Sequence, residues 1–308
     1  SNQYETSNGF TTPITVNSFN FSDTALKSGD NPSVTLIFSE AVTSFSSYAD
    51  ISVANGTLAT MTSTDNITWS GTFTPSTNTE DASNTLSLAT SYTDTDGNEG
   101  PGVRTLNYEV DTLAPSVNSL TFSDTALKAG ENTTVTLVFS EAVASFSSSA
   151  DITVGNGTLT TMTSSDNITW TGTFTPTTNT EDSSNTLSLA TSYTDNAGNA
   201  GPSAITDNYV VETLAPSVNS FTLSDTALKA GDNATVTLVF SERVASFSSS
   251  ADITVVNGTL ATMASSDNIT WSGTFTPTTN TEDASNMLSL AASYTDNAGN
   301  AGPAVTTA

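Results

Sequence analysis

The sequence predicts an all-β protein made of three tandem β-sandwich domains, and three observations lead to this prediction. The 308-residue chain repeats itself with a period of 101 residues. Within each repeat, apolar residues alternate with polar ones, which is the periodicity of a half-buried strand. Turn-forming residues separate these short alternating segments. We therefore expect many short strands in three similar domains that follow one another along an extended rod.

The repeat is carried by several motifs that recur at the same spacing. Ser-Asp-Thr-Ala-Leu-Lys begins at residues 22, 123 and 224, and Asn-Ile-Thr-Trp ends at Trp69, Trp170 and Trp271. Leu-Ala-Pro marks both junctions, at 113–115 and 214–216, where proline stiffens a short connection. The expected parts are a tag remnant at 1–12 and domains at 13–113, 114–214 and 215–308, the last with a truncated C-terminal strand.

Seven strands are expected in the first repeat, at 16–22, 33–39, 50–54, 57–63, 66–74, 85–92 and 103–110. Asn55-Gly56 is a dipeptide typical of hairpin turns. Trp69 occupies an inward position in its strand, so we expect it to anchor the core between two sheets. Seven short strands in about 100 residues are typical of an immunoglobulin-like sandwich.

The composition excludes several classes of function. A formal charge of −26 rules out the basic footprint of a nucleic-acid-binding protein and argues against docking on anionic lipid. The chain has no histidine and no cysteine, which excludes a Ser-His-Asp triad, a thiolate nucleophile, a structural zinc centre and disulfides. No apolar run approaches the roughly 18 residues needed to cross a bilayer. We expect a monomer without direct membrane insertion.

Eight acidic positions recur in all three repeats, and the expected strand order places them in loops at the two ends of each domain. In the first repeat they are Asp23, Asp30, Glu40, Asp50, Asp65, Glu80, Asp81 and Asp94. Tandem stacking brings the C-terminal end of one domain onto the N-terminal end of the next, with Asp111 or Glu212 in the linker. Like charges at close range repel, and a hard divalent cation with oxygen ligands removes the repulsion. Calcium suits such scattered carboxylates better than magnesium does.

Four segments of the second repeat closely resemble bacterial Ig-like repeats. They are Val-Thr-Leu-Val-Phe-Ser-Glu-Ala-Val (135–143), Asn-Gly-Thr-Leu (156–159), Thr-Trp-Thr-Gly-Thr-Phe-Thr-Pro (169–176) and Asp-Asn-Ala-Gly-Asn-Ala-Gly (195–201). Such repeats form the extender regions of large repetitive surface adhesins, which are often exported by type I secretion. The resemblance implies an Ig-like fold, an extracellular location at the bacterial cell surface and a spacer role in cell adhesion. It also implies that calcium stiffens the junctions.

By that family pattern, the leading ligands are the linker acid, the acid of Ser-Glu and the aspartate that opens Asp-Asn-Ala-Gly-Asn. Glu212 departs from the more usual linker aspartate, and Arg243 lies beside the expected ligand Glu242. The ends of the domains add further acids. The predicted calcium ligands are Asp23, Asp81, Asp111, Glu141 and Asp195 at the first junction, and Asp124, Asp182, Glu212, Glu242 and Asp296 at the second.

The sequence is also compatible with other interpretations. Acids in loops are ordinary turn residues that keep a protein soluble, and Lys27, Lys128 and Lys229 could neutralise part of each cluster without metal. The repeats could themselves bind a carbohydrate or protein ligand in adhesion or biofilm formation. Glu80 and Asp81 could in principle hydrolyse glycosides, but the same acids in every repeat fit architecture better than catalysis. We expect no enzyme activity.

Overall fold

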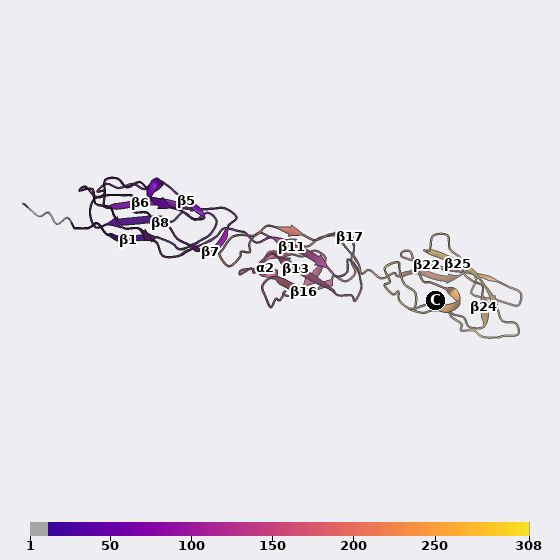
Figure 1. Cartoon of the computed structure of the whole chain (residues 1–308). Coiled ribbons are helices and arrows are strands. Elements are labelled where there is room, and N and C mark those ends of the chain that lie inside the picture. Colours follow the sequence, from indigo (N-terminus) through magenta and orange to yellow (C-terminus); the bar gives the residue numbers. More distant parts are fainter. Residues whose placement is uncertain (1–11, 308) are drawn as a thin grey trace, which may run out of the picture.

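The computed structural model describes residues 12–307, which form three β-sandwich domains joined end to end (Figure 1). The expected tag remnant at 1–12 lies, apart from residue 12, outside the described residues. Within 12–307 each helix is a single four-residue turn, and none is long or apolar enough to cross a membrane.

The first domain contains ten strands and one helical turn. They are β1 (Val16–Phe21), β2 (Ala25–Leu26), β3 (Ser33–Phe38), α1 (Ser47–Asp50), β4 (Ile51–Ser52), β5 (Gly56–Leu58), β6 (Thr68–Pro75), β7 (Glu80–Asn84), β8 (Ser87–Leu88), β9 (Val103–Arg104) and β10 (Tyr108–Asp111).

The second domain repeats this order, and the third keeps part of it. The elements of the second domain are β11 (Val117–Phe122), β12 (Ala126–Lys128), β13 (Thr133–Phe139), α2 (Ser148–Asp151), β14 (Ile152–Thr153), β15 (Gly157–Leu159), β16 (Thr169–Pro176), β17 (Glu181–Asn185), β18 (Ser188–Leu189), β19 (Ala204–Ile205) and β20 (Tyr209–Glu212). Those of the third are β21 (Val218–Leu223), β22 (Ala234–Phe240), α3 (Ser249–Asp252), β23 (Ile253–Thr254), β24 (Gly258–Leu260), β25 (Thr270–Pro277), β26 (Ser289–Leu290) and β27 (Val305–Thr306).

Each complete domain packs one four-stranded sheet against two smaller sheets. In the first domain the large sheet has the order β1-β3-β6-β5, and the small sheets are β2-β10-β7 and β4-β8-β9. All pairs are antiparallel except β2 with β10, which run parallel. The third domain has the large sheet and β23-β26-β27, but its described residues form no sheet equivalent to β2-β10-β7.

The core between these layers combines aliphatic side chains with phenylalanine and tyrosine rings. Phe38 packs against Tyr92 with ring centroids 4.9 Å apart, and Phe73 packs against Tyr108 at 5.4 Å. Both tyrosines are fully buried, and their hydroxyls donate to backbone carbonyls. Trp69, by contrast, is only half-buried and packs on Phe45 at the margin of the core. The expectation that tryptophan anchors the core is therefore only partly met.

The strand plan expected from the sequence differs from the structure in several places. Residues 80–84 form a strand instead of a loop, and the short β2 was not anticipated. The strand expected at 50–54 begins with the last residue of α1, and the one at 103–110 is divided into β9 and β10. Asn55, with φ 47°, does not close a hairpin, because β4 pairs with β8 whereas β5 pairs with β6. It turns the chain from one layer of the sandwich to the other.

Candidate calcium sites at the domain junctions

The linker acid at each junction is fixed to the domain that precedes it. Asp111 ends β10. The next residue, Thr112, is buried, and its Oγ1 donates to the carbonyl of Ser76 at 2.6 Å and accepts from the N–H of Thr79 at 3.0 Å. Thr213 makes the same bonds after Glu212. These bonds hold the linker acid at the end of the sheet.

A second acid stands directly opposite the linker acid on the neighbouring strand. Asp111 pairs with Glu80 between β10 and β7, and Glu212 pairs with Glu181 between β20 and β17. Directly opposed residues of antiparallel strands project on the same face, where like charges are destabilising. Each of the first two domains therefore presents a pair of carboxylates to the domain that follows it.

The following domain meets this pair with a loop that closes on its own aspartate. Asp195 is buried, and its Oδ1 accepts the N–H groups of Gly198 and Asn199 at 2.7 and 2.8 Å. Asp296 organises the 296–300 loop in the same way, with Gly299 and Asn300. The aspartate of Asp-Asn-Ala-Gly-Asn therefore stabilises the conformation of its own loop through these hydrogen bonds.

The last residue of this loop makes hydrogen bonds across the junction. The Nδ2 of Asn199 donates to the carbonyl of Asp111 at 2.9 Å and to Asp195 Oδ2 at 2.8 Å. Its Oδ1 accepts the N–H of Ser28 at 2.9 Å. Asn300 repeats this pattern with Glu212, Asp296 and Ala129. Each asparagine is almost completely buried and connects two domains. We call this arrangement the asparagine clamp.

At the first junction, four carboxylates interact electrostatically. Burial raises the pKa of Asp111, and the charges of Asp195 and Glu80 raise it further. Burial also raises the pKa of Glu141, which follows β13, and the charges of Asp195, Asp111 and Glu80 add to the effect. The junction therefore holds its acids in surroundings that disfavour their negative charge.

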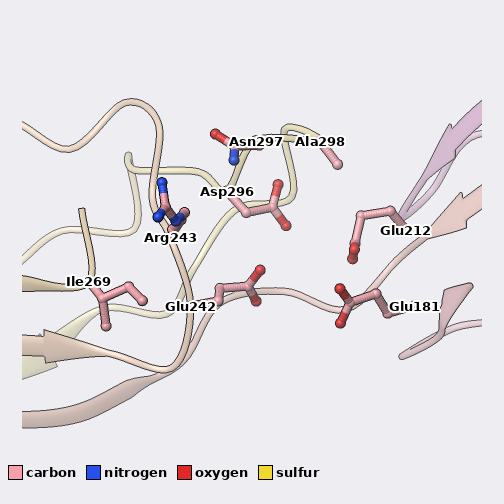
Figure 2. A pocket seen from close by; sticks show the side chains of 8 residues that line it. All are labelled: Glu181, Glu212, Glu242, Arg243, Ile269, Asp296, Asn297 and Ala298. Atoms are coloured by element: carbon pink, nitrogen blue, oxygen red, sulfur yellow. The ribbon is translucent and has the colours of Figure 1, made fainter. Parts of the chain in front are cut away.

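The second junction contains the equivalent acids around a cavity of about 390 Å³. Figure 2 shows Glu181 and Glu212 on one side of the gap, facing Glu242 and Asp296 on the other. Burial raises the pKa of Glu242, as do the charges of Asp296, Glu212 and Glu181. Burial also raises the pKa of Glu212, with added effects of Glu181 and Asp296.

Not all of the predicted ligands take part in these clusters. Asp81 accepts hydrogen bonds from Asn55 Nδ2 and the N–H of Ser83, and Asp182 has the same partners in its own domain. Asp23 and Asp124 each accept a backbone N–H two residues ahead, in an exposed turn. These four acids therefore serve their own domains, whereas Asp111, Glu141, Asp195, Glu212, Glu242 and Asp296 gather at the junctions. Glu80 and Glu181 join them and were not among the predicted ligands.

The nearby basic residues leave the junction acids unpaired. Lys27 pairs with Asp30 at 2.9 Å, and Lys128 lies 3.8 Å from Glu131, within the same turn. The stem of Lys27 also approaches the next domain, since a Cβ on Gly198 would lie 3.2 Å from its Cδ. Arg243 lines the second cavity, but it forms no ion pair with any carboxylate among residues 12–307.

The oxygen ligands at the junctions suit a hard cation, although the acidic side chains are not close enough together to coordinate one. In residues 12–307, no three acidic side chains are close enough to one another to hold a metal ion. The available ligands are carboxylate and carbonyl oxygens, which calcium prefers and soft transition metals do not. Calcium at the junctions stays a prediction, with Asp111, Glu141, Asp195 and Glu80, or their counterparts, as the residues that would hold it.

The raised pKa values give a testable pH dependence in the metal-free chain. The folded junction favours the protonated forms of Asp111 and Glu141, so the repulsion is absent below their ordinary pKa values of 3.8 and 4.5. The repulsion grows as the pH rises through the raised pKa values of the folded chain, because both carboxyl groups then become charged. The junction should therefore be more stable near pH 4 than near pH 7. NMR titration of carboxyl carbons in chelator measures these pKa values. Asp166 is an internal control, because backbone N–H groups lower its pKa. Ordinary values at Asp111 and Glu141 would contradict the electrostatic account.

Several solved structures match the chain at low sequence identity and low TM-score. The Escherichia coli adhesin FdeC is 13% identical, covers 96% of both chains and has a TM-score of 0.36. Invasin, a bacterial integrin-binding protein, is 13% identical with a TM-score of 0.31, over 90% of this chain and 55% of its own. The titin I9–I11 tandem is 7% identical with a TM-score of 0.30, over 90% and 92% of the two chains. No curated protein matches the chain in sequence.

The family assignment rests on the repeats themselves, because these superpositions are weak. The family model described as bacterial Ig-like domain matches residues 11–110, 111–211 and 212–308. Its three matches follow the three sandwiches and together span almost the whole chain. The chain belongs to the bacterial Ig-like domain family, of which it contains three tandem copies.

Proposed function

We propose that the chain is a structural extender module of a bacterial cell-surface adhesin, without enzymatic activity. Calcium bound at the domain junctions rigidifies the row of domains, which projects a distal ligand-binding domain away from the cell. Tandem domains in an end-to-end arrangement suit such a spacer (Figure 1). The proposal includes an extracellular location and export by type I secretion.

One observation carries the calcium part of the proposal. At each junction a directly opposed pair, Asp111 with Glu80 or Glu212 with Glu181, faces two more acids of the next domain. The asparagine clamp keeps these charges together although they repel, and no basic residue among residues 12–307 pairs with them. A divalent cation would convert this repulsion into an attraction between neighbouring domains.

The mechanical consequence follows from where the acids lie. In the absence of calcium, repulsion opposes the clamp, so we expect larger bending at the linkers. In the presence of calcium, each domain is tied to the next from both sides of the junction. Cells keep free calcium low, so the chain would remain flexible during export and stiffen only outside.

Small-angle scattering and thermal unfolding in calcium and in chelator test the proposal. Three stacked sandwiches should extend to roughly 120 Å. We expect calcium to increase the maximum dimension and raise the melting temperature. At a concentration 100 times the Kd the stabilisation amounts to about 2.7 kcal/mol. Magnesium at the same concentration should have a smaller effect, since it demands stricter octahedral geometry.

Variants then locate the effect. A chain with Asp111→Asn, Glu141→Gln, Glu212→Gln and Glu242→Gln should lose the response to calcium while remaining folded, because it also loses the repulsion. Glu99→Gln with Asp207→Asn removes exposed charges away from both clusters and should keep the response. Identical scattering and melting in calcium and chelator would leave an extender stiffened only by its hydrogen bonds and proline linkers.

A further inference from the structure

The two junctions differ in the residue that follows the Ser-Glu acid. Ala142 stands there at the first junction and Arg243 at the second, and the first repeat has Ala41 at the same position. The four junction acids otherwise correspond, except that Asp111 is replaced by Glu212. Arg243 therefore adds one positive charge to an acidic cluster whose counterpart has none at this place.

The backbone places this arginine beside two of the acids. It directly follows Glu242, and the next residue, Val244, is paired with Asp296 in an isolated antiparallel bridge. At the first junction Val143 and Asp195 form the same bridge. Because the local backbone is the same, an exchange of the alanine and the arginine compares two side chains in one setting.

The side chain of Arg243 lines the junction cavity without being committed to a partner. Figure 2 shows it on the side of the gap that carries Glu242 and Asp296, across from Glu181 and Glu212. The residue is exposed, and within residues 12–307 it forms no ion pair. A guanidinium has five N–H donors in a planar arrangement that matches carboxylates. It can therefore turn toward the acids without losing an existing ion pair.

The lysines near the junctions do not create such a difference, because each junction has one. Lys27 at the first junction pairs with Asp30 at 2.9 Å, and Lys128 at the second lies 3.8 Å from Glu131. Each lysine thus faces an acid of its own turn and adds the same charge at the same place. Among the basic residues near the junctions within 12–307, Arg243 is the one that distinguishes them.

We infer that Arg243 is a built-in counterion of the second junction, so that the two junctions become rigid at different calcium concentrations. This inference rests on the proposed calcium-dependent extender. Without calcium, the guanidinium reduces the repulsion among the four acids of the second junction. With calcium, the same positive charge repels the ion and competes with it for the carboxylates. The first junction is therefore the looser one in chelator and the first to stiffen as calcium rises.

Spin labels measure each junction separately in the full chain. One doubly labelled chain carries Ser70→Cys and Thr171→Cys across the first junction, and another carries Thr171→Cys and Ser272→Cys across the second. All three positions are exposed, and the chain has no cysteine of its own. In chelator the distance distribution should be broader across the first junction. In a calcium titration the second junction should narrow at a roughly tenfold higher concentration, as expected for one positive charge near a divalent ion.

Variants separate the charge of the arginine from its size. Exchanging the two residues, Ala142→Arg with Arg243→Ala, should reverse the order in which the junctions respond. Arg243→Met retains a long side chain without charge and should behave like Arg243→Ala, whereas Arg243→Lys should keep the original order. Added salt should reduce the difference between the junctions, because exposed charges are screened. Thermal unfolding in chelator checks that each variant is folded.

The outcomes distinguish this inference from the function on which it rests. Equal calcium midpoints at the two junctions, or an order that the exchange of Ala142 and Arg243 leaves unchanged, would overturn the role of the arginine and leave the calcium-dependent extender standing. A chain in which neither junction responds to calcium would overturn both. A reversed order after the exchange, together with retention of the order by Arg243→Lys, would support the charge of Arg243 as the cause.

Discussion

Replacing Gly157 with alanine is expected to destabilise the second domain by about 3 kcal/mol, at the upper end of the cost of overpacking a core. A Cβ at this position would lie 2.1 Å from Phe174 Cζ and 2.5 Å from Cε2. Phe174 is fully buried, and its ring is held between Phe122 and Tyr209, each with a centroid 5.3 Å away. A shift of the ring away from the new Cβ would therefore disturb its packing on these two neighbours.

Gly155 provides a matched control two residues earlier in the same turn. A Cβ there would lie 3.9 Å from Tyr209 Oη, an ordinary contact, and the first repeat carries Ala54 at this position. Gly155→Ala should change stability by no more than about 0.5 kcal/mol. Hydrogen exchange measured by mass spectrometry reports each domain separately, so the unaltered first and third domains are internal references. Equal effects of the two substitutions would show that the ring of Phe174 is not the constraint.

The sequence predicts the fold where periodicity and burial coincide. Strands such as β3 and β6 alternate apolar and polar residues, and their positions were anticipated closely. By contrast, β7 reads Glu-Asp-Ala-Ser-Asn, which has no apolar alternation and low strand propensity. It becomes a strand because β10 pairs with it, an interaction between distant parts of the chain. The third domain supports this explanation, since residues 282–286 form no strand where no partner lies beside them.

The site was predictable only to the extent that loop order fixes which ends of the domains meet. Asp111, Glu141 and Asp195 were expected at the first junction, and the structure gathers them there. The sequence places Asp81 with them because it predicts a loop at 80 and 81. In a strand, successive side chains point to opposite faces, so Glu80 reaches the junction and Asp81 does not.

The asparagine clamp is not predicted by the sequence, in which Asp-Asn-Ala-Gly-Asn indicates only a source of oxygen ligands. An amide side chain both donates and accepts, which a carboxylate cannot do. The final Asn of the motif in the second and third repeats could have suggested a bridge between a carbonyl and an N–H. Its partners, Asp111 and Ser28, lie in the preceding domain, so no local pattern reveals them.

Replacing Asn199 with alanine is expected to release the first junction. The substitution removes the two short hydrogen bonds that Asn199 makes between domains, to the carbonyl of Asp111 and from the N–H of Ser28, together with a long one of 3.5 Å to Asp111 Oδ1. At about 1 kcal/mol for each short bond, the coupling between the two domains should fall by about 2 kcal/mol. The chain has no cysteine, so spin labels at Ser70→Cys and Thr171→Cys, both exposed, can report the distance between domains. We expect the distance distribution to broaden.

Asn98→Ala separates this effect from damage to the loop itself. Asn98 makes the same bonds within its loop, from its N–H to Asp94 Oδ1 at 2.9 Å and from Nδ2 to Asp94 Oδ2 at 2.8 Å. It makes no described bond to another domain, so its substitution should leave the distance distribution unchanged. The junction has two possible restraints, the asparagine clamp and bound calcium, and the Asn199→Ala chain retains only the second. If calcium binds the junction acids, it should narrow the distance distribution of the Asn199→Ala chain, whereas chelator should leave that distribution broad. A distribution that Asn199→Ala leaves narrow in chelator would show that linker packing alone fixes the domains, because neither the clamp nor a metal ion would then be holding them.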